Sequence, residues 1–128
     1  MKIVKAGLEH AGLTEKIIGA AIGVHKALGP GFLESVYENA LVVALRDAGL
    51  PHEQQREVPV TYNGIQVGLH RLDLLVAGLI VVELKAVKDI EDVHFAVVRS
   101  YLKALNLKHG LLLNFSKKTL EVRRVIHE

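Results

Sequence analysis

The sequence predicts an α/β domain in which helices flank a central mixed β-sheet. Segments with apolar residues at helical spacing stand on both sides of a group of apolar segments that have the character of strands. Half of the 128 residues are hydrophobic, which suits one domain that buries its own core. We therefore expect residues 1–128 to form a single domain with the element order ααβββαββ.

Two helices are expected first. Thr14 is the predicted cap of the first helix, which ends at Leu28 because Gly29-Pro30-Gly31 cannot continue it. His25 lies on its apolar side, where we expect a core-edge histidine bonded to the backbone, with a role in the site as the alternative. The second helix covers residues 32–48. Its expected buried stripe consists of Leu33, Val36, Tyr37, Ala40, Leu41, Ala44 and Ala48.

Two polar positions of the second helix matter for function. At about 100° per residue, Glu34 falls in line with Leu41 on the margin of the buried stripe, while Glu38 is expected further toward water. A carboxylate beside a buried stripe could reach a metal, and its alternative role is to favour the helix dipole. Tyr37 is either a core residue with a bonded hydroxyl or a substrate contact.

Three strands follow and form an antiparallel meander. Residues 53–62 alternate loosely and turn at Asn63-Gly64, a strong hairpin signal. Residues 65–76 return as the next strand, and residues 79–87 form the third. We expect all three to lie side by side in the sheet.

A helix and two strands complete the order. The helix begins at Asp89, Glu91 or Asp92 and runs to about Asn106. Residues 110–115 are short and apolar, which predicts a buried strand parallel to its neighbour after a helical crossover. Residues 119–126 supply the last strand, with Arg123 and Arg124 near an edge of the sheet.

Charged residues interrupt the two most apolar strands. Glu83 and Lys85 share one face because side chains alternate with a period of two. Asp73 joins them only if the numbers of two directly paired residues add up to an even number. This pairing requires a loop with an odd number of residues. The three residues 76–78 suit this, because Gly78 accepts a positive φ. The alternative is that Glu83 and Lys85 form an ordinary salt bridge on a solvated face and that Asp73 is a strand-end or edge residue.

This pattern resembles a known catalytic motif. Asp73, followed ten residues later by Glu83-x-Lys85, is similar to the catalytic pattern of the PD-(D/E)XK nuclease superfamily, although no Pro precedes Asp73. Residues 31–37 (GFLESVY) match the signature of the GxxExxY protein family, small bacterial and archaeal proteins assigned to that superfamily. The likeness continues over most of the chain, at Ile17-Ile18, Val24-His25, residues 28–31, residues 71–74, residues 82–85, residues 100–103 and residues 111–115.

The resemblance implies a restriction-endonuclease-like core and a metal-dependent phosphodiesterase. Its catalytic residues would be Asp73, Glu83, Lys85 and Glu34. Asp73, Glu83 and the backbone carbonyl of Leu84 would supply hard oxygens to Mg²⁺ or Mn²⁺. The expected substrate contacts are Tyr37, Tyr101 and Arg71.

One position departs from the family pattern. The family carries a Gln four residues before the tyrosine of the late helix, whereas this chain has Val97 before Tyr101. His94, one turn earlier, is the candidate to replace part of the role of the missing amide. The substitution keeps an alternative open, namely a catalytically weak or inactive module of the same fold that binds nucleic acid or protein.

The amino-acid composition excludes several classes of site and of protein. The absence of cysteine excludes disulfides, thiolate metal sites and a cysteine nucleophile. No apolar run approaches the roughly 18 residues of a membrane span, and no cleavage signature follows Met1, so we expect a cytoplasmic protein without membrane contact. A net charge of +2 is too small to indicate nucleic acid by itself. DNA is a more probable substrate than RNA on family grounds, and the small size of the chain favours a homodimer.

Overall fold

Three helices and five strands follow one another in the predicted order ααβββαββ in a computed structural model that describes residues 9–128. The helices are α1 (Ala11–Leu28), α2 (Glu34–Asp47) and α3 (Asp92–Leu105). The strands are β1 (His52–Tyr62), β2 (Ile65–Val76), β3 (Ile80–Lys85), β4 (His109–Asn114) and β5 (Glu121–Ile126). The predicted fold class is therefore confirmed.

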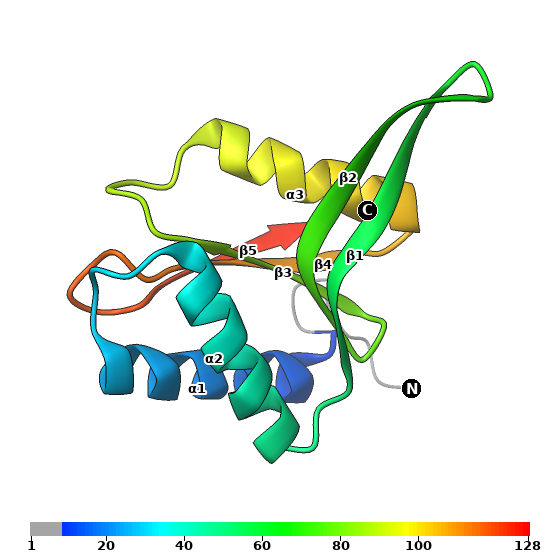
Figure 1. The fold of residues 1–128 in the computed structure, drawn as a ribbon. Coiled ribbons are helices and arrows are strands. Elements are labelled where there is room, and N and C mark those ends of the chain that lie inside the picture. Colours follow the sequence, from blue (N-terminus) through cyan, green and yellow to red (C-terminus); the bar gives the residue numbers. More distant parts are fainter. Residues whose placement is uncertain (1–8) are drawn as a thin grey trace.

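The strands form one mixed sheet in the order β1-β2-β3-β4-β5. All neighbours are antiparallel except β3 and β4, which run parallel because α3 carries the chain back over the sheet between them. The helices α1 and α2 cover one face of the sheet, α3 covers the other, and the β1–β2 hairpin extends beyond both layers (Figure 1). None of the helices within residues 9–128 combines the length and apolar character needed to cross a bilayer.

Each face of the sheet has its own apolar cluster. The cluster under α1 and α2 contains Ile17, Tyr37 and Leu41 packed on Val82 and Leu113. The cluster under α3 is built in the same way, from Val58, Leu72, Leu75, Val81, Val98, Tyr101, Leu102, Leu112 and Val125. The central strands are buried on both faces, which explains their continuous apolar sequences.

The beginnings of the first two helices differ from the prediction. Residue Thr14 lies buried in the first turn of α1 and does not cap it, because His10 is the N-cap residue. Leu33 is the N-cap residue of α2, with an extended backbone, so it stands outside the helical repeat and is 77% exposed. Val36 is also exposed, at 38%. His25 behaves as expected, with Nε2 2.8 Å from the backbone oxygen of Lys117.

The turn between β2 and β3 has the predicted parity but a different position. Val76 pairs with Ile80, so the loop consists of residues 77–79 and not of residues 76–78. Both Ala77 (φ 55°) and Gly78 (φ 68°) have positive φ, and the N–H of Leu79 donates a 3.0 Å bond to the Val76 oxygen. The loop still contains three residues, so the register places Asp73 opposite Glu83, as the odd loop predicted.

Candidate active site

The strands β2 and β3 separate next to the two acidic residues. Their backbone pairing ends at Leu74 and Val82. Beyond this point the N–H of Asp73 donates a 2.7 Å hydrogen bond to Oε1 of Glu83, and the N–H of Leu84 donates a 2.9 Å bond to Oδ2 of Asp73. The two carboxylates therefore occupy the gap in the sheet, where main-chain carbonyls would stand in a regular ladder.

The backbone of β2 is irregular at the same place. Leu72 packs in the cluster under α3, whereas Leu74 packs in the cluster under α1 and α2. A regular strand would place both side chains on one face, so the alternation breaks at Asp73. On β1, Gln55 lies opposite Asp73 and has φ 54°, a conformation that costs a residue other than glycine some free energy. Two neighbouring strands are thus distorted around this carboxylate.

Both carboxyl groups hold their protons more tightly than usual. Burial raises the pKa of Asp73 to about 6, against the opposing hydrogen bond from Leu84. Burial, followed by the negative charge of Asp73, raises the pKa of Glu83 to about 8. Two carboxylates forced together in a sheet are costly when both are ionised, and a divalent cation between them would remove that cost.

The backbone of Leu84 completes a set of oxygen ligands. In an extended strand the N–H and C=O of one residue point to the same edge, and the N–H of Leu84 points to Asp73. We therefore expect its carbonyl also to face the gap, where β2 no longer pairs with β3. Two carboxylates and one carbonyl are hard oxygen donors of the kind that Mg²⁺ and Mn²⁺ prefer. The residues present fit such an ion.

Lys85 stands at the end of β3, two residues after Glu83. It is half-buried, and its positive charge opposes the rise in the pKa of Glu83, so its ammonium lies within electrostatic reach of the carboxylate. Its backbone oxygen accepts a 2.8 Å hydrogen bond from the N–H of Phe115, which fixes the strand end against the chain beyond β4.

Glu34 lies near the carboxylate pair but does not join it. It is the first residue of α2, it is exposed, and its Oε1 accepts a 3.3 Å hydrogen bond from the N–H of Ala86. Its charge contributes to the raised pKa values of Asp73 and Glu83. Within residues 9–128, however, it forms no group of three ligand atoms within 4.8 Å with them, so the structure places Glu34 at the rim.

Glu38 is a site neighbour that the sequence placed wrongly. It was expected toward water, but it is only 9% exposed. Its Oε2 accepts a 2.6 Å bond from the Gln54 side-chain amide, and its Oε1 accepts a 2.9 Å bond from Gln55. The Gln55 amide also lies 3.4 Å from Oδ1 of Asp73. The two amides allow Glu38 to be buried, and the adjacent glutamines at the start of β1 were the signal that could have indicated this.

Tyr37 was expected among the substrate contacts, and the structure places it in the core. Its side chain is 0% exposed and stacks on Phe115 with ring centroids 4.5 Å apart. The hydroxyl donates a 2.6 Å hydrogen bond to the Gly29 oxygen and accepts a 3.1 Å bond from the N–H of Phe32. This tyrosine holds the connection between α1 and α2, and it has no surface to offer a substrate.

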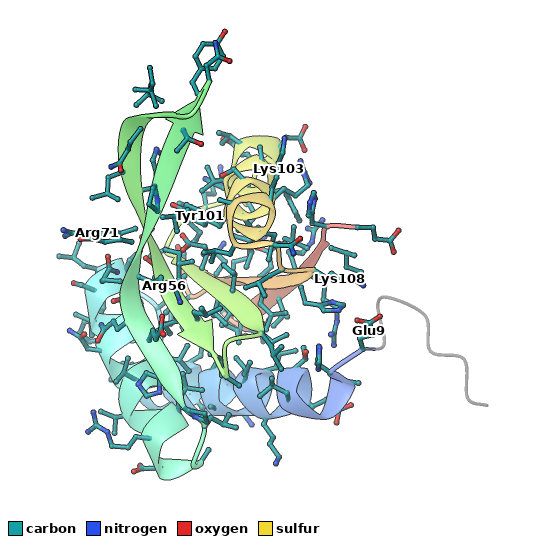
Figure 2. The ribbon with its side chains drawn as sticks, turned by 90° about the vertical axis from the view of Figure 1, so that its right-hand side faces the viewer. Glu9, Arg56, Arg71, Tyr101, Lys103 and Lys108 are labelled. Carbon is teal, nitrogen blue, oxygen red and sulfur yellow. The ribbon has the colours of Figure 1, made fainter. Side chains whose placement is uncertain are left out.

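Tyr101 and Arg71 lie on the other side of the gap. Tyr101 projects from α3 toward the hairpin (Figure 2), and its hydroxyl is 3.5 Å from the backbone oxygen of Arg71. Burial, with the charges of Glu83 and Asp73, raises the pKa of this phenol to about 12. It stays protonated and can donate a hydrogen bond. The side chain of Arg71 is exposed and lies 3.5 Å from Glu57.

The structure also shows the surroundings of Val97, which replaces the family glutamine, and of His94, the candidate substitute for its amide. Val97 is half-buried on α3, one turn before Tyr101. His94 does not replace the amide, because its Nδ1 accepts a hydrogen bond from the N–H of Glu91 in a capping box. The amide nearest to the carboxylates among the described side-chain hydrogen bonds is that of Gln55, which comes from β1.

Asp73 and Glu83 thus lie in the gap of a mixed sheet, with Lys85 on the same strand as Glu83. The chain belongs to the PD-(D/E)XK nuclease superfamily, whose sequence profile matches residues 11–125. A solved structure titled "Crystal structure of SSO0001" has a similar fold, with a TM-score of 0.57 and 14% sequence identity over 94% of this chain. This chain spans 60% of that structure's length. No curated protein matches the sequence.

Proposed function

We propose that this protein is a nuclease that hydrolyses phosphodiester bonds with Mg²⁺ or Mn²⁺, with DNA as its substrate. The observation that carries the proposal is the pair Asp73 and Glu83, a half-buried and a buried carboxyl group with raised pKa values at a break in the sheet. Nucleases of this superfamily generally use divalent metals and act on nucleic acid. The sequence 31–37 supports membership of the GxxExxY family within it.

In this proposal each residue of the gap has a role. Asp73, Glu83 and the carbonyl of Leu84 would hold the metal, which would polarise the phosphate and acidify a water. Lys85 orients that water or stabilises the charge that develops during attack. Glu34 at the rim would accept a hydrogen bond from a water of the metal shell. The phenol of Tyr101 and the exposed guanidinium of Arg71 hold the substrate backbone.

The test is cleavage of labelled DNA and RNA by the purified chain with Mg²⁺, with Mn²⁺ and with a chelator. We expect Asp73→Asn and Glu83→Gln each to lower the rate by about a hundredfold or more, because each removes a charged metal ligand. Glu53→Gln is the matched control, an exposed strand carboxylate that pairs with Arg56 outside the gap. Equal activity in all variants, or activity that persists in the chelator, would overturn the proposal.

A second candidate function is a module that binds nucleic acid or protein with little or no turnover. Two observations favour it: Val97 stands where the family has Gln, and each carboxylate of the pair already accepts a hydrogen bond from a backbone amide. Binding that is unchanged in Asp73→Asn, together with no cleavage in any metal, would select this function.

We further propose that the protein acts as a homodimer, because one copy of 128 residues covers little of a duplex. Light scattering during gel filtration, with and without a duplex, measures the mass directly. A monomer in both conditions would reject the dimer and leave the nuclease proposal untouched.

A further inference from the structure

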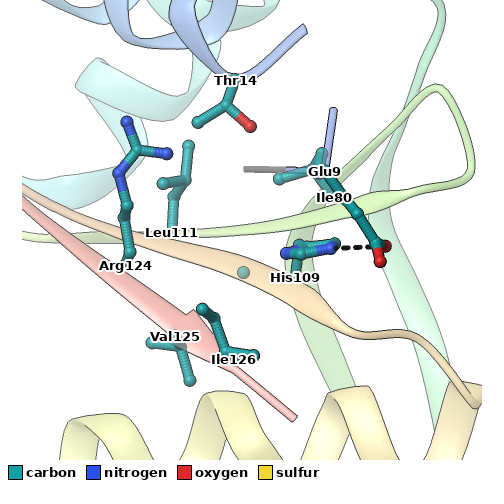
Figure 3. A pocket seen from close by; sticks show the side chains of 9 residues that line it. Glu9, Thr14, Ile80, His109, Leu111, Arg124, Val125 and Ile126 are labelled. Carbon is teal, nitrogen blue, oxygen red and sulfur yellow. Dashed lines mark hydrogen bonds and ion pairs between the residues drawn. The ribbon is translucent and has the colours of Figure 1, made fainter. Parts of the chain in front are cut away.

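A second group of ligating side chains lies apart from the carboxylate pair. Glu9 and His10 directly precede α1, and His109 is the first residue of β4. Figure 3 shows Glu9 and His109 pointing toward each other beside a small cavity that Thr14 and Arg124 also line. No local sequence pattern indicates this group, because His109 lies 100 residues after Glu9.

The geometry of the group suits one small ion. Nε2 of His109 lies 3.3 Å from Oε2 of Glu9, and the rings of His10 and His109 are 5.6 Å apart in an edge-to-face arrangement. One ligand atom from each of the three residues lies within 4.8 Å of the other two. Ligands in a tetrahedral zinc site stand about 3.4 Å apart, given bonds of about 2.0–2.2 Å, so the ligand atoms would have to move closer, and the exposed His10 is the side chain that would move.

We propose that Glu9, His10 and His109 form a binding site for Zn²⁺ or a similar first-row transition ion. Two imidazoles and one carboxylate favour such an ion over Mg²⁺, which prefers an all-oxygen shell. Three protein ligands leave the fourth position to water. This is a different ligand class from the oxygen set of Asp73, Glu83 and Leu84.

The site would fasten the start of α1 to the sheet. His109 pairs with Ile80, at the end of the parallel strands opposite to the one where Glu83 lies. Glu83 follows Ile80 by three positions, which corresponds to about 10 Å along the strand. The ion would thus bind away from the carboxylate pair and would cross-link two elements that are distant in sequence, as structural metals do.

The charges around the group are mixed. The hydrogen bond from His109, with smaller effects from Lys108 and from the charges of His109 and His10, lowers the pKa of Glu9, so this carboxylate is ionised at neutral pH. Arg124 lines the same cavity and adds positive charge, which opposes a cation. His109 is buried against the sheet, and its Nε2 donates a hydrogen bond to Glu9, so it is the most preorganised of the three ligands.

The experiment is a calorimetric Zn²⁺ titration of the full chain after removal of metals, with Co²⁺ absorption as a second measurement of the ligand set. Asp73→Asn/Glu83→Gln serves as the background, so the titration reports on this site even if the nuclease proposal fails. We expect one Zn²⁺ per chain, and a loss of affinity of about tenfold or more in His109→Gln and in His10→Ala. His10 is exposed, so its variant tests binding without endangering the fold.

His127→Ala is the matched control. Its backbone N–H pairs with Lys108 next to His109, but its side chain is not a member of the group. Equal Zn²⁺ affinity in His10→Ala, His109→Gln and His127→Ala would overturn the proposal, since binding would then come from scattered surface histidines. The absence of Zn²⁺ binding in the background protein would also overturn it and leave Glu9 and His109 as an ion pair only.

Discussion

The N–H of Asp73 donates a 2.7 Å hydrogen bond to the carboxylate of Glu83, at the point where β2 and β3 cease to pair. A carboxylate in this position satisfies a strand amide that would otherwise lack a partner in the sheet. The bond also holds Glu83 against the negative charge of Asp73. The same contact therefore maintains the strand separation and keeps two acidic groups together, which makes the pair sensitive to protons and to cations.

The first prediction concerns pH and stability in the absence of metal. The folded-state pKa values of Asp73 and Glu83, about 6 and about 8, lie above the ordinary values of 3.8 and 4.5. Between these limits the folded protein binds more protons than the unfolded chain, so stability falls as pH rises from about 4 to about 8. We expect Glu83→Gln to flatten this slope. Thermal unfolding of both proteins in chelator, measured at several pH values, checks it.

Divalent metal should reverse the trend. An ion that binds the ionised pair stabilises the folded state most where protons compete least, so Mg²⁺ should raise the Tm more at pH 8 than at pH 6. Glu53→Gln, which leaves the gap intact, should behave as the parent protein does. A slope that is the same in parent and Glu83→Gln would contradict the assigned pKa shifts.

The second prediction assigns a positioning role to Gln55. Its amide bonds Glu38 at 2.9 Å and approaches Asp73 at 3.4 Å. If the amide orients Asp73, Gln55→Ala and Gln55→Gly should both weaken metal affinity by about tenfold. Gln55→Gly accepts the positive φ without strain, so it separates loss of the amide from backbone effects.

Gln54→Ala is the control for Gln55. Gln54 bonds Glu38 at 2.6 Å but makes no hydrogen bond to Asp73 among the described residues. Both alanine variants should therefore reduce the free energy of unfolding, by about 1–2 kcal/mol. Only the Gln55 variants should reduce Mn²⁺ affinity in a calorimetric titration. Equal affinities in Gln54→Ala and Gln55→Ala would reject the positioning role.

The order of elements and the pairing of Asp73 with Glu83 followed from local rules. These rules depend only on residues that are close in sequence. They are the apolar periodicity, the Asn63-Gly64 turn and the odd number of residues in the loop before β3. Even a loop placed one residue too early kept the correct face, because parity depends only on whether the loop is odd. The meander of the first three strands and a parallel strand after a helical crossover were also predictable, because short connections join neighbouring strands and a helix returns the chain in the same direction.

The environment of the pair was less predictable, because it depends on contacts between distant segments. Glu38 was assigned to water on helical angle alone, and only the amides of Gln54 and Gln55 from β1 make its burial possible. The sequence allowed Tyr37 to be a core residue or a substrate contact. Its contacts with Phe115 and the Gly29 oxygen, which come from other segments, place it in the core. The break in alternation at Asp73 leaves no signal in the sequence of β2.

The third prediction separates the two tyrosines. Tyr37→Phe removes a hydroxyl that bonds Gly29 and Phe32, so it should lower the free energy of unfolding by about 1–3 kcal/mol. Tyr101→Phe removes a longer bond of 3.5 Å and should change stability less. If Tyr101 holds substrate, its variant should raise KM in the cleavage assay, while folded Tyr37→Phe should cleave as the parent does.

Tyr62→Phe is the control for both tyrosines. Tyr62 lies on the hairpin and is 69% exposed, so the loss of its hydroxyl should leave unfolding and cleavage unchanged. Urea titration gives the unfolding free energies. A Tyr37→Phe protein with full stability but lower substrate affinity would restore the role first expected for this residue.

The fourth prediction tests how closely α3 packs on the sheet. A Cβ atom at Gly110 would stand 2.7 Å from Cγ1 of Val98, closer than carbon atoms approach, so β4 or α3 must shift. Gly110→Ala should therefore lower the free energy of unfolding by about 1–3 kcal/mol, and Val98→Ala in the same chain should recover part of the loss. Gly68→Ala is the control, because its nearest contact would be an ordinary 3.8 Å. Additive losses in the double variant would show that the two residues do not meet.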